Sequence, residues 1–256
     1  MPLTKFHITT FFLFFSVLVA SSQERTKVYI AAASDLKFAL DAIVEKFERN
    51  HQDVQVEVTY GSSGKLYEQI THSAPFDLFF SADIAYPQQL TAKGLALSKV
   101  YTYGIGRIVL WSSKVDPSIK KMNALLDPVI RKIAIASPTH APYGKRAEEA
   151  LKHYELYSKV SDKLVFGENI SQTAQFITTG AADIGIIALS LAMSPAMKDL
   201  NGKYYLIPED SHQPLVQGFI VLTHAKENKG ASDFRGYMLT QEAKDILSDF
   251  GFAPAK

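Results

Sequence analysis

Short apolar runs alternate along the chain with longer stretches in which apolar residues recur at helical spacing. The runs are rich in Val, Ile, Leu and Phe, and most lack the in-out alternation of a half-exposed strand. Continuous apolar strands are typical of parallel sheets that are covered on both faces. The predicted strands are 27–33, 54–60, 78–82, 107–111, 132–136, 164–166, 183–188, 204–207 and 217–223.

The stretches between these runs have the period of amphipathic helices. In 35–50 (DLKFALDAIVEKFERN), the residues Leu36, Leu40, Ile43 and Phe47 fall on one stripe. Residues 143–157 and 232–250 show a similar pattern. Alternation of strands and helices predicts an α/β fold with mostly parallel sheets flanked by helices.

This number of strands favours two lobes over one sheet. We expect the chain to cross between the lobes near Gly106 and again within 210–214 (DSHQP). The first lobe would then combine residues 23–106 with 214–256, and the second would be 107–213. A ligand would bind in the cleft between the lobes, where the open ends of the two sheets face each other.

The N-terminus has the features of a secretory signal peptide. Lys5 provides a short positive start, and the apolar run 11–19 (FFLFFSVLV) is too short to span a bilayer as a helix. Small residues at 20–22 then precede a polar segment, which is typical of a cleavage site. We therefore predict a cleavable signal at 1–22 and a periplasmic mature protein; an uncleaved membrane anchor is the alternative.

Composition and charge narrow the classes of function. The 27 Lys and Arg residues nearly balance 26 Asp and Glu, giving a net charge of +1. A polyanionic partner such as nucleic acid is therefore not expected, although a local site can still hold a small anion. The chain has no cysteine, which excludes disulfides, thiolate metal sites and cysteine nucleophiles. No cofactor is expected.

Candidate anion-binding groups lie where strands are followed by helices. Ser34 ends the first strand, Ser62 and Ser63 lie between glycines after the second, and Tyr143 lies in a Pro-Tyr-Gly turn that opens a helix. The first N–H groups of a helix lack intrahelical acceptors and carry partial positive charge, so such ends bind anions. The alternative at each serine is a simple N-cap, and Ser34 is placed as one.

Catalytic motifs are missing from the sequence. None of the seven histidines forms an HExxH pair, and neither a GxSxG elbow nor a GxxxxGK[ST] loop occurs. Residues 61–65 (GSSGK) only faintly match a phosphate loop. Asp77, Asp83 and Asp183 lie at strand ends, where caps and turns are the expected roles. We predict that the protein is not an enzyme.

Several short motifs follow one another along the mature chain. They are AAASDL at 31–36, GSSGKL at 61–66, APFDLFFSAD at 74–83, PYG at 142–144, ENI at 168–170, AADIGI at 181–186 and PEDSH at 208–212. In their combination and spacing, these motifs resemble those of the periplasmic molybdate-binding proteins of ABC transporters.

The resemblance implies a type II periplasmic binding protein fold and a set of uncharged ligands for the oxyanion. It maps these ligands onto Ser34 and Ser63, and onto the backbone N–H groups of Tyr143 and Ile170. Many members add a tyrosine hydroxyl at the position occupied here by Ala188, so one donor is missing from this chain. The hydroxyl of Tyr143 is a candidate to replace it.

The resemblance also implies a function and its partners. The protein is expected to capture molybdate, and also tungstate, and to deliver it as a monomer to an ABC permease in the inner membrane. One alternative is a binding protein for sulfate or another small tetrahedral oxyanion. Others are an exported hydrolase that uses Ser63 with a histidine, and a sensor domain of the same fold.

Overall fold

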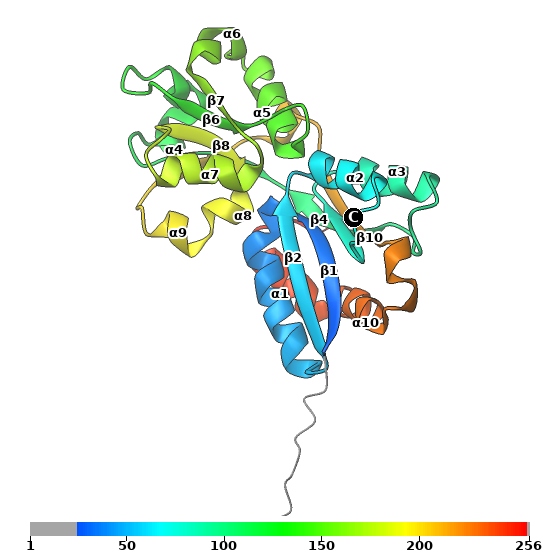
Figure 1. Ribbon diagram of the computed structural model, residues 1–256. Helices are drawn as coiled ribbons and strands as arrows, with labels where there is room; N and C mark the ends of the chain where they lie inside the picture. The colour runs from blue at the N-terminus through cyan, green and yellow to red at the C-terminus, as the bar shows by residue number, and fades with distance from the viewer. Residues whose placement is uncertain (1–24, 255–256) are drawn as a thin grey trace, which may run out of the picture.

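The computed structural model describes residues 25–254, which form two five-stranded sheets (Figure 1). The predicted signal peptide at 1–22 lies outside the described residues. The first sheet has the order β2-β1-β3-β10-β4, with β1 Thr26–Ala33, β2 Val54–Gly61, β3 Leu78–Ser81, β4 Tyr101–Gly106 and β10 Leu215–Val221. The second has the order β7-β6-β8-β5-β9, with β5 Ile108–Ser112, β6 Ile133–Ala136, β7 Leu164–Gly167, β8 Ile184–Ala188 and β9 Lys203–Leu206.

Both sheets are mixed, with two parallel and two antiparallel pairings in each, although four of the five strands run in one direction, as the apolar runs predicted. In each sheet one strand runs against the other four: β10 lies reversed between β3 and β4, and β5 lies reversed between β8 and β9. The chain passes from the first sheet to the second between Gly106 and Ile108, and returns to the first at Leu215. The predicted lobe boundaries after residues 106 and 213 fall at these two crossings, and the division into two lobes stays a prediction.

Helices flank each sheet separately (Figure 1). The first sheet carries η1 Ser34–Leu36, α1 Lys37–Asn50, α2 Ser63–Thr71, α3 Ala85–Ala92, η5 Thr223–Glu227, α10 Lys229–Met238 and α11 Gln241–Asp249. The second carries α4 Pro117–Lys120, η2 Lys121–Leu126, α5 Pro142–His153, α6 Tyr157–Val160, η3 Ser161–Lys163, α7 Ile170–Thr178, α8 Leu189–Ala192 and α9 Pro195–Lys198, and η4 Glu209–Ser211 lies on the returning chain.

The buried apolar side chains follow the same division. One cluster fills the second sheet and its helices; from the first sheet's side it includes Ala33, Ala82 and Leu215, and Phe38 of α1 packs against it. The predicted apolar stripe of α1 lies in a different cluster, where Phe47 is fully buried with its ring centroid 5.0 Å from that of Phe234. The buried apolar side chains therefore cluster largely by sheet, with one cluster on the second sheet and two on the first.

The structure differs from the sequence-based expectation in two elements. The strand β4 (YTYGIG) was not predicted, because its two glycines and its threonine interrupt the apolar run by which the other strands were recognised. The stretch 232–250 was expected to be one helix, but it is two, α10 and α11. The break lies at Thr240, whose hydroxyl accepts a hydrogen bond from the N–H of Ala243 and so caps α11.

Replacing Gly236 by alanine is expected to stabilise the protein. Gly236 lies inside α10, and a Cβ atom added there would have no neighbour within 4 Å. Alanine lowers the backbone entropy of the unfolded chain, which is worth about 0.5–1 kcal/mol in a helix interior. Urea unfolding measures the change. Gly180→Ala is the matched control and should destabilise, because its φ of +73° is strained for any residue with a Cβ; a loss of stability in Gly236→Ala would contradict the prediction.

Candidate functional site

A small pocket lies where the two sheets meet, and it contains all four predicted ligand residues. Its cavity volume is about 10 Å³, and about 10–15 Å³ is the room that one water needs on this measure. Only a small ligand would fit such a pocket. The wall is formed by Ala33, Ser34, Asp35, Gly61, Ser62, Ser63, Ala82, Ala141, Pro142, Tyr143 and Ile170.

Three helix N-termini from both sheets contribute to this wall. Ser63 is the first residue of α2, Ile170 is the first residue of α7, and Tyr143 follows Pro142 at the start of α5. N–H groups at these positions have no acceptor within their own helices, and the helix dipoles make them attractive to an anion. Small side chains such as Ala33 and Gly61 leave these backbone groups accessible from the pocket.

The serine hydroxyls of the pocket have different partners. The Oγ of Ser63 accepts a hydrogen bond of 3.0 Å from the N–H of Ala82, which leaves its proton free to donate. The neighbouring Ser62 is buried, and its hydroxyl has no partner among the described residues. Sequence reasoning singled out the Ser-Ser pair, but it did not show which hydroxyl would lack a partner.

Ser34 is bound across the junction of the sheets instead of capping its own helix. Its hydroxyl donates to Oδ1 of Asn169 at 3.2 Å and accepts from the N–H of Ser171 at 3.3 Å. No side-chain cap is found at η1, whose N-cap residue is Ala33. The predicted N-cap role of Ser34 is therefore wrong, because the start of α7 offers its hydroxyl better partners. To bind an anion through its hydroxyl, Ser34 must exchange Asn169 for the ligand.

The hydroxyl of Tyr143 is hydrogen-bonded to two protein side chains. It donates to Oδ2 of Asp35 at 3.0 Å and accepts from Nε2 of Gln217 at 3.0 Å. A side chain at Gly106 would collide with this group, since a Cβ there would lie 2.4 Å from the Tyr143 hydroxyl. Ala188 ends β8, is fully buried and is not part of the pocket wall. In this conformation Asp35 and Gln217 therefore occupy the Tyr143 hydroxyl, and its role as a substitute donor stays a prediction.

Asp35 was not predicted as a site residue, because the sequence pattern placed it at the start of a helix. The structure buries it in the pocket wall, where Oδ2 accepts from Tyr143 and from Gln217. Burial raises the pKa of Asp35 to about 6, although hydrogen bonds from Gln217 and Tyr143 lower it. The pocket therefore contains one ionisable group beside its neutral donors.

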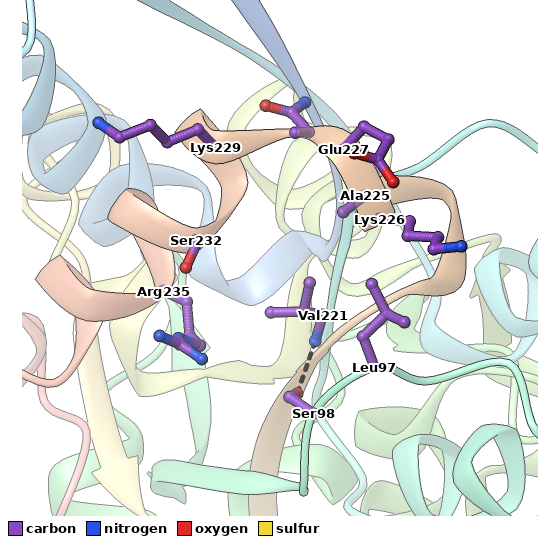
Figure 2. Close-up of a pocket in the computed structure, with 10 residues that line it drawn as sticks. Leu97, Ser98, Val221, Ala225, Lys226, Glu227, Lys229, Ser232 and Arg235 are labelled. Carbon is purple, nitrogen blue, oxygen red and sulfur yellow. Dashed lines mark hydrogen bonds between the residues drawn. The ribbon is translucent and has the colours of Figure 1, made fainter.

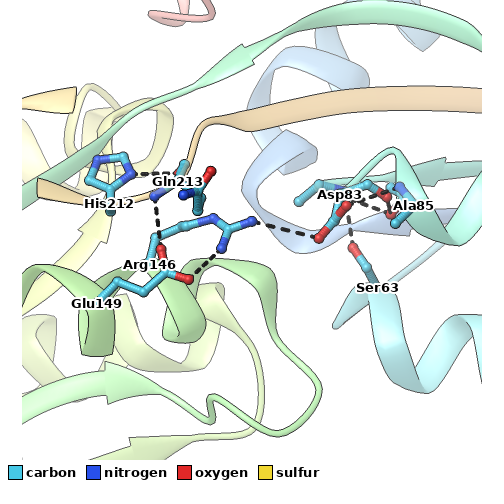
Figure 3. A network of polar contacts seen from close by, with 9 residues as sticks. Ser63, Asp83, Ala85, Arg146, Glu149, His212 and Gln213 are labelled. Carbon is cyan, nitrogen blue, oxygen red and sulfur yellow. Dashed lines mark hydrogen bonds and ion pairs between the residues drawn. The ribbon is translucent and has the colours of Figure 1, made fainter. Parts of the chain in front are cut away.

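Charged residues around the pocket are paired with other protein groups. Arg146 of α5 reaches Glu149 at 2.7 Å and Asp83, which follows β3, at 3.8 Å (Figure 3). Lys65 of α2 and Glu168, which precedes α7, form a second ion pair at 2.9 Å. Both the Arg146–Asp83 and Lys65–Glu168 pairs link the two sheets, so they favour the conformation in which the pocket is closed.

A larger pocket of about 340 Å³ lies on the first sheet's side and contains none of the predicted site residues (Figure 2). Lys226 and Lys229 line it, and Figure 2 shows their side chains extending in opposite directions. Within residues 25–254 no group of three or more His, Asp or Glu could hold a metal ion. Across the same residues, no helix has the length and apolar character needed to cross a bilayer.

Comparison with known proteins identifies the family. Residues 28–253 match the model of the bacterial extracellular solute-binding proteins. The chain is 34% identical over 199 residues to the molybdate-binding protein ModA of Rhodobacter capsulatus, covering 77% of each chain.

Solved structures agree with this assignment. The Azotobacter vinelandii periplasmic molybdate-binding protein superposes with a TM-score of 0.83 at 30% identity, over 90% of this chain and all of that one. The sulfate-binding protein SubI of Mycobacterium tuberculosis, at 16% identity and a TM-score of 0.73 over 91% of this chain and 88% of that one, shares the fold alone. The resemblance and the predicted fold are confirmed, and the relatives are binding proteins, not enzymes. The chain belongs to the family of bacterial extracellular solute-binding proteins.

Proposed function

We propose that this protein captures molybdate, and also tungstate, and delivers it to an ABC permease. The observation that carries the proposal is the convergence of uncharged hydrogen-bond donors from both sheets on one small pocket. Relatives at 30–34% identity are named molybdate-binding proteins, whereas the sulfate-binding protein shares only the fold at 16% identity. Molybdate is therefore preferred to sulfate as the ligand.

The proposed ligand set consists of two hydroxyls and two backbone groups. Ser34 and Ser63 supply hydroxyl donors, and Tyr143 and Ile170 supply N–H groups from the starts of α5 and α7. Ser62 adds a buried hydroxyl that has no protein partner among the described residues. This set needs no cofactor and no metal beyond the one inside the oxyanion.

Binding is proposed to close two lobes around the anion. The first lobe is 23–106 with 214–256, and the second is 107–213, which corresponds to the division of strands between the sheets. The chain crosses between them at two points, near Gly106 and before Leu215, where small backbone rotations can open the cleft. The N–H of Gly64, which donates to the carbonyl of His140 at 2.9 Å, joins the lobes in the closed form.

Selectivity follows from the chemistry of the donors and from the size of the pocket. A protonated anion would bury an O–H group among donors, which costs free energy and disfavours hydrogen phosphate. Sulfate carries the same charge as molybdate, so pocket size must separate the two. Tungstate is close to molybdate in size and should bind comparably. The proposed location is the periplasm, reached through the signal peptide at 1–22, and the proposed state is a monomer that docks on the permease.

A thermal-shift panel on the purified mature protein tests the proposal. Molybdate and tungstate at about a hundred times their Kd should stabilise the folded protein by about 2.7 kcal/mol, which raises the Tm of a protein of this size by about 5–10 °C. Sulfate and phosphate at the same concentration should leave the Tm unchanged. A shift with sulfate and none with molybdate would overturn the assignment of the ligand.

A further inference from the structure

Asp35 is an acidic side chain in a pocket that otherwise presents neutral donors. Only 1% of its surface is exposed, and it lies in the pocket wall between Ser34 and the start of α1. Its Oδ2 accepts from the Tyr143 hydroxyl at 3.0 Å and from the Gln217 amide at 2.9 Å. Its Oδ1 is buried and has no hydrogen-bond partner among the described residues.

The surroundings of Asp35 contain no compensating positive charge. The described ion pairs do not include Asp35, and α7 and α8, which pack against it, carry no ionisable residue. On α1 the charged residues Lys37 and Asp41 pair with each other at 3.0 Å and are half-exposed. The other polar groups around Asp35 are neutral. Tyr143 of α5 and Gln217 of β10 donate to its carboxylate, and Tyr103 of β4 donates to Gln217. Ser190 of α8 donates to the Asp35 carbonyl.

Neither of the two tyrosines near Asp35 gives up its own proton to the carboxylate. Burial raises the pKa of Tyr103 and of Tyr143 well above the usual value, so both stay protonated. Tyr143 and Gln217 therefore act on Asp35 only as hydrogen-bond donors to Oδ2. A proton on the carboxyl group would then lie on Oδ1, the oxygen that lacks a partner.

We propose that Asp35 binds the oxyanion as a neutral carboxylic acid that donates a hydrogen bond from Oδ1, so that capture of one anion takes up one proton. This inference rests on the proposed function, since it needs a dianion in the pocket beside Ser34 and Ser63. Asp35 then becomes a further donor in the place of the hydroxyl that Ala188 does not provide.

The sign of the effect follows from linkage. Burial raises the pKa of Asp35 in the closed protein to about 6, and a bound dianion raises it further because like charges repel. The backbone of Asp35 and Leu36 lowers the pKa, but Oδ1 itself has no partner of acceptable hydrogen-bond geometry. Below the pKa of the ligand-free protein the carboxyl is already neutral and affinity is constant. Above it, binding must add a proton, and affinity falls by about tenfold per pH unit.

Calorimetry with sodium molybdate tests the proposal directly. The wild-type protein is titrated between pH 6.5 and 8.5, where molybdate is the dianion, in two buffers that differ in ionisation enthalpy. At pH 8 the heats should report uptake of nearly one proton, and the Kd should weaken by about tenfold per pH unit. The wild-type measurement decides the matter even if a variant fails to fold.

Asp35→Asn provides the second arm. The amide oxygen can accept from Tyr143 and Gln217, and the NH₂ group takes the place of the protonated Oδ1. This variant should show no proton uptake, a Kd independent of pH and, at pH 8, affinity up to about a hundredfold higher than wild type. Asp41→Asn, an exposed acid on the adjoining helix, should keep the wild-type pH dependence.

The outcomes separate this inference from the proposed function. Tight molybdate binding with a Kd independent of pH and no proton uptake would overturn the role of Asp35 and leave the function standing. Stronger binding of phosphate than of molybdate at pH 8 would show that Oδ1 accepts a hydrogen bond from the ligand. That result would also overturn the role of Asp35 as a donor. Absence of molybdate binding in all three proteins at every pH would overturn both.

Discussion

Ser63→Ala and Ser34→Ala are each expected to weaken molybdate binding by about ten- to a hundredfold, equivalent to about 1–3 kcal/mol. Each substitution removes a hydroxyl donor, and a buried anion oxygen loses a partner that water cannot replace. The loss should be larger for Ser63, whose proton is free in the ligand-free protein. Ser34 must first give up its hydrogen bond to Asn169, so part of its contribution is offset.

Calorimetric measurement of the Kd tests these two variants. Ser63→Ala also leaves the N–H of Ala82 without its acceptor, so its thermal unfolding should be recorded and the titration run well below the midpoint. Ser232→Ala, an exposed position on α10, is the matched control and should bind like wild type. An unchanged Kd for both Ser34→Ala and Ser63→Ala would exclude these side chains from the ligand set.

Gly64→Val is expected to prevent closure of the pocket and to lower molybdate affinity by at least about ten- to a hundredfold. A Cβ atom at this position would lie 2.7 Å from the carbonyl oxygen of His140 and 2.9 Å from the hydroxyl of Tyr86. His140 belongs to the second sheet's side, so the new side chain would hold the two sheets apart. Tyr86 belongs to the first sheet's side and packs against an apolar cluster there, so the thermal unfolding of the variant should be recorded beside its affinity.

Two measurements distinguish a side chain that prevents closure of the pocket from one that destabilises the whole protein. Calorimetry should show the loss of affinity, and small-angle scattering should show that molybdate no longer makes the variant more compact. Gly236→Ala, a glycine with open space around it, is the control and should bind and compact like wild type. Normal compaction of Gly64→Val on adding molybdate would contradict the proposed closure.

The sequence was sufficient for features that depend on neighbouring residues. The apolar runs gave all the strands except β4, and the stripe on α1 gave its buried face, because burial of a strand or helix leaves a periodic pattern in the chain. The helix start at Ser63 is also a local signal, since it follows a strand and a glycine within a few residues. Ile170, the first residue of α7, came only from the family resemblance. The family resemblance then joined them into one site.

Other features depended on contacts between distant parts of the chain, and only the tertiary structure decided them. Asp35 becomes a buried acid through Tyr143 and Gln217, which are 108 and 182 residues away in sequence. The same contacts occupy the Tyr143 hydroxyl, which the family resemblance made a candidate to replace the missing tyrosine. The sequence by itself determined which elements form, because their periodic patterns are local, and its assignment of backbone groups to anion binding stays a prediction. The packing of the two sheets against each other decided which side chains keep a free donor. Hydrogen-bond partners and burial depend on proximity in space and leave no local pattern in the sequence.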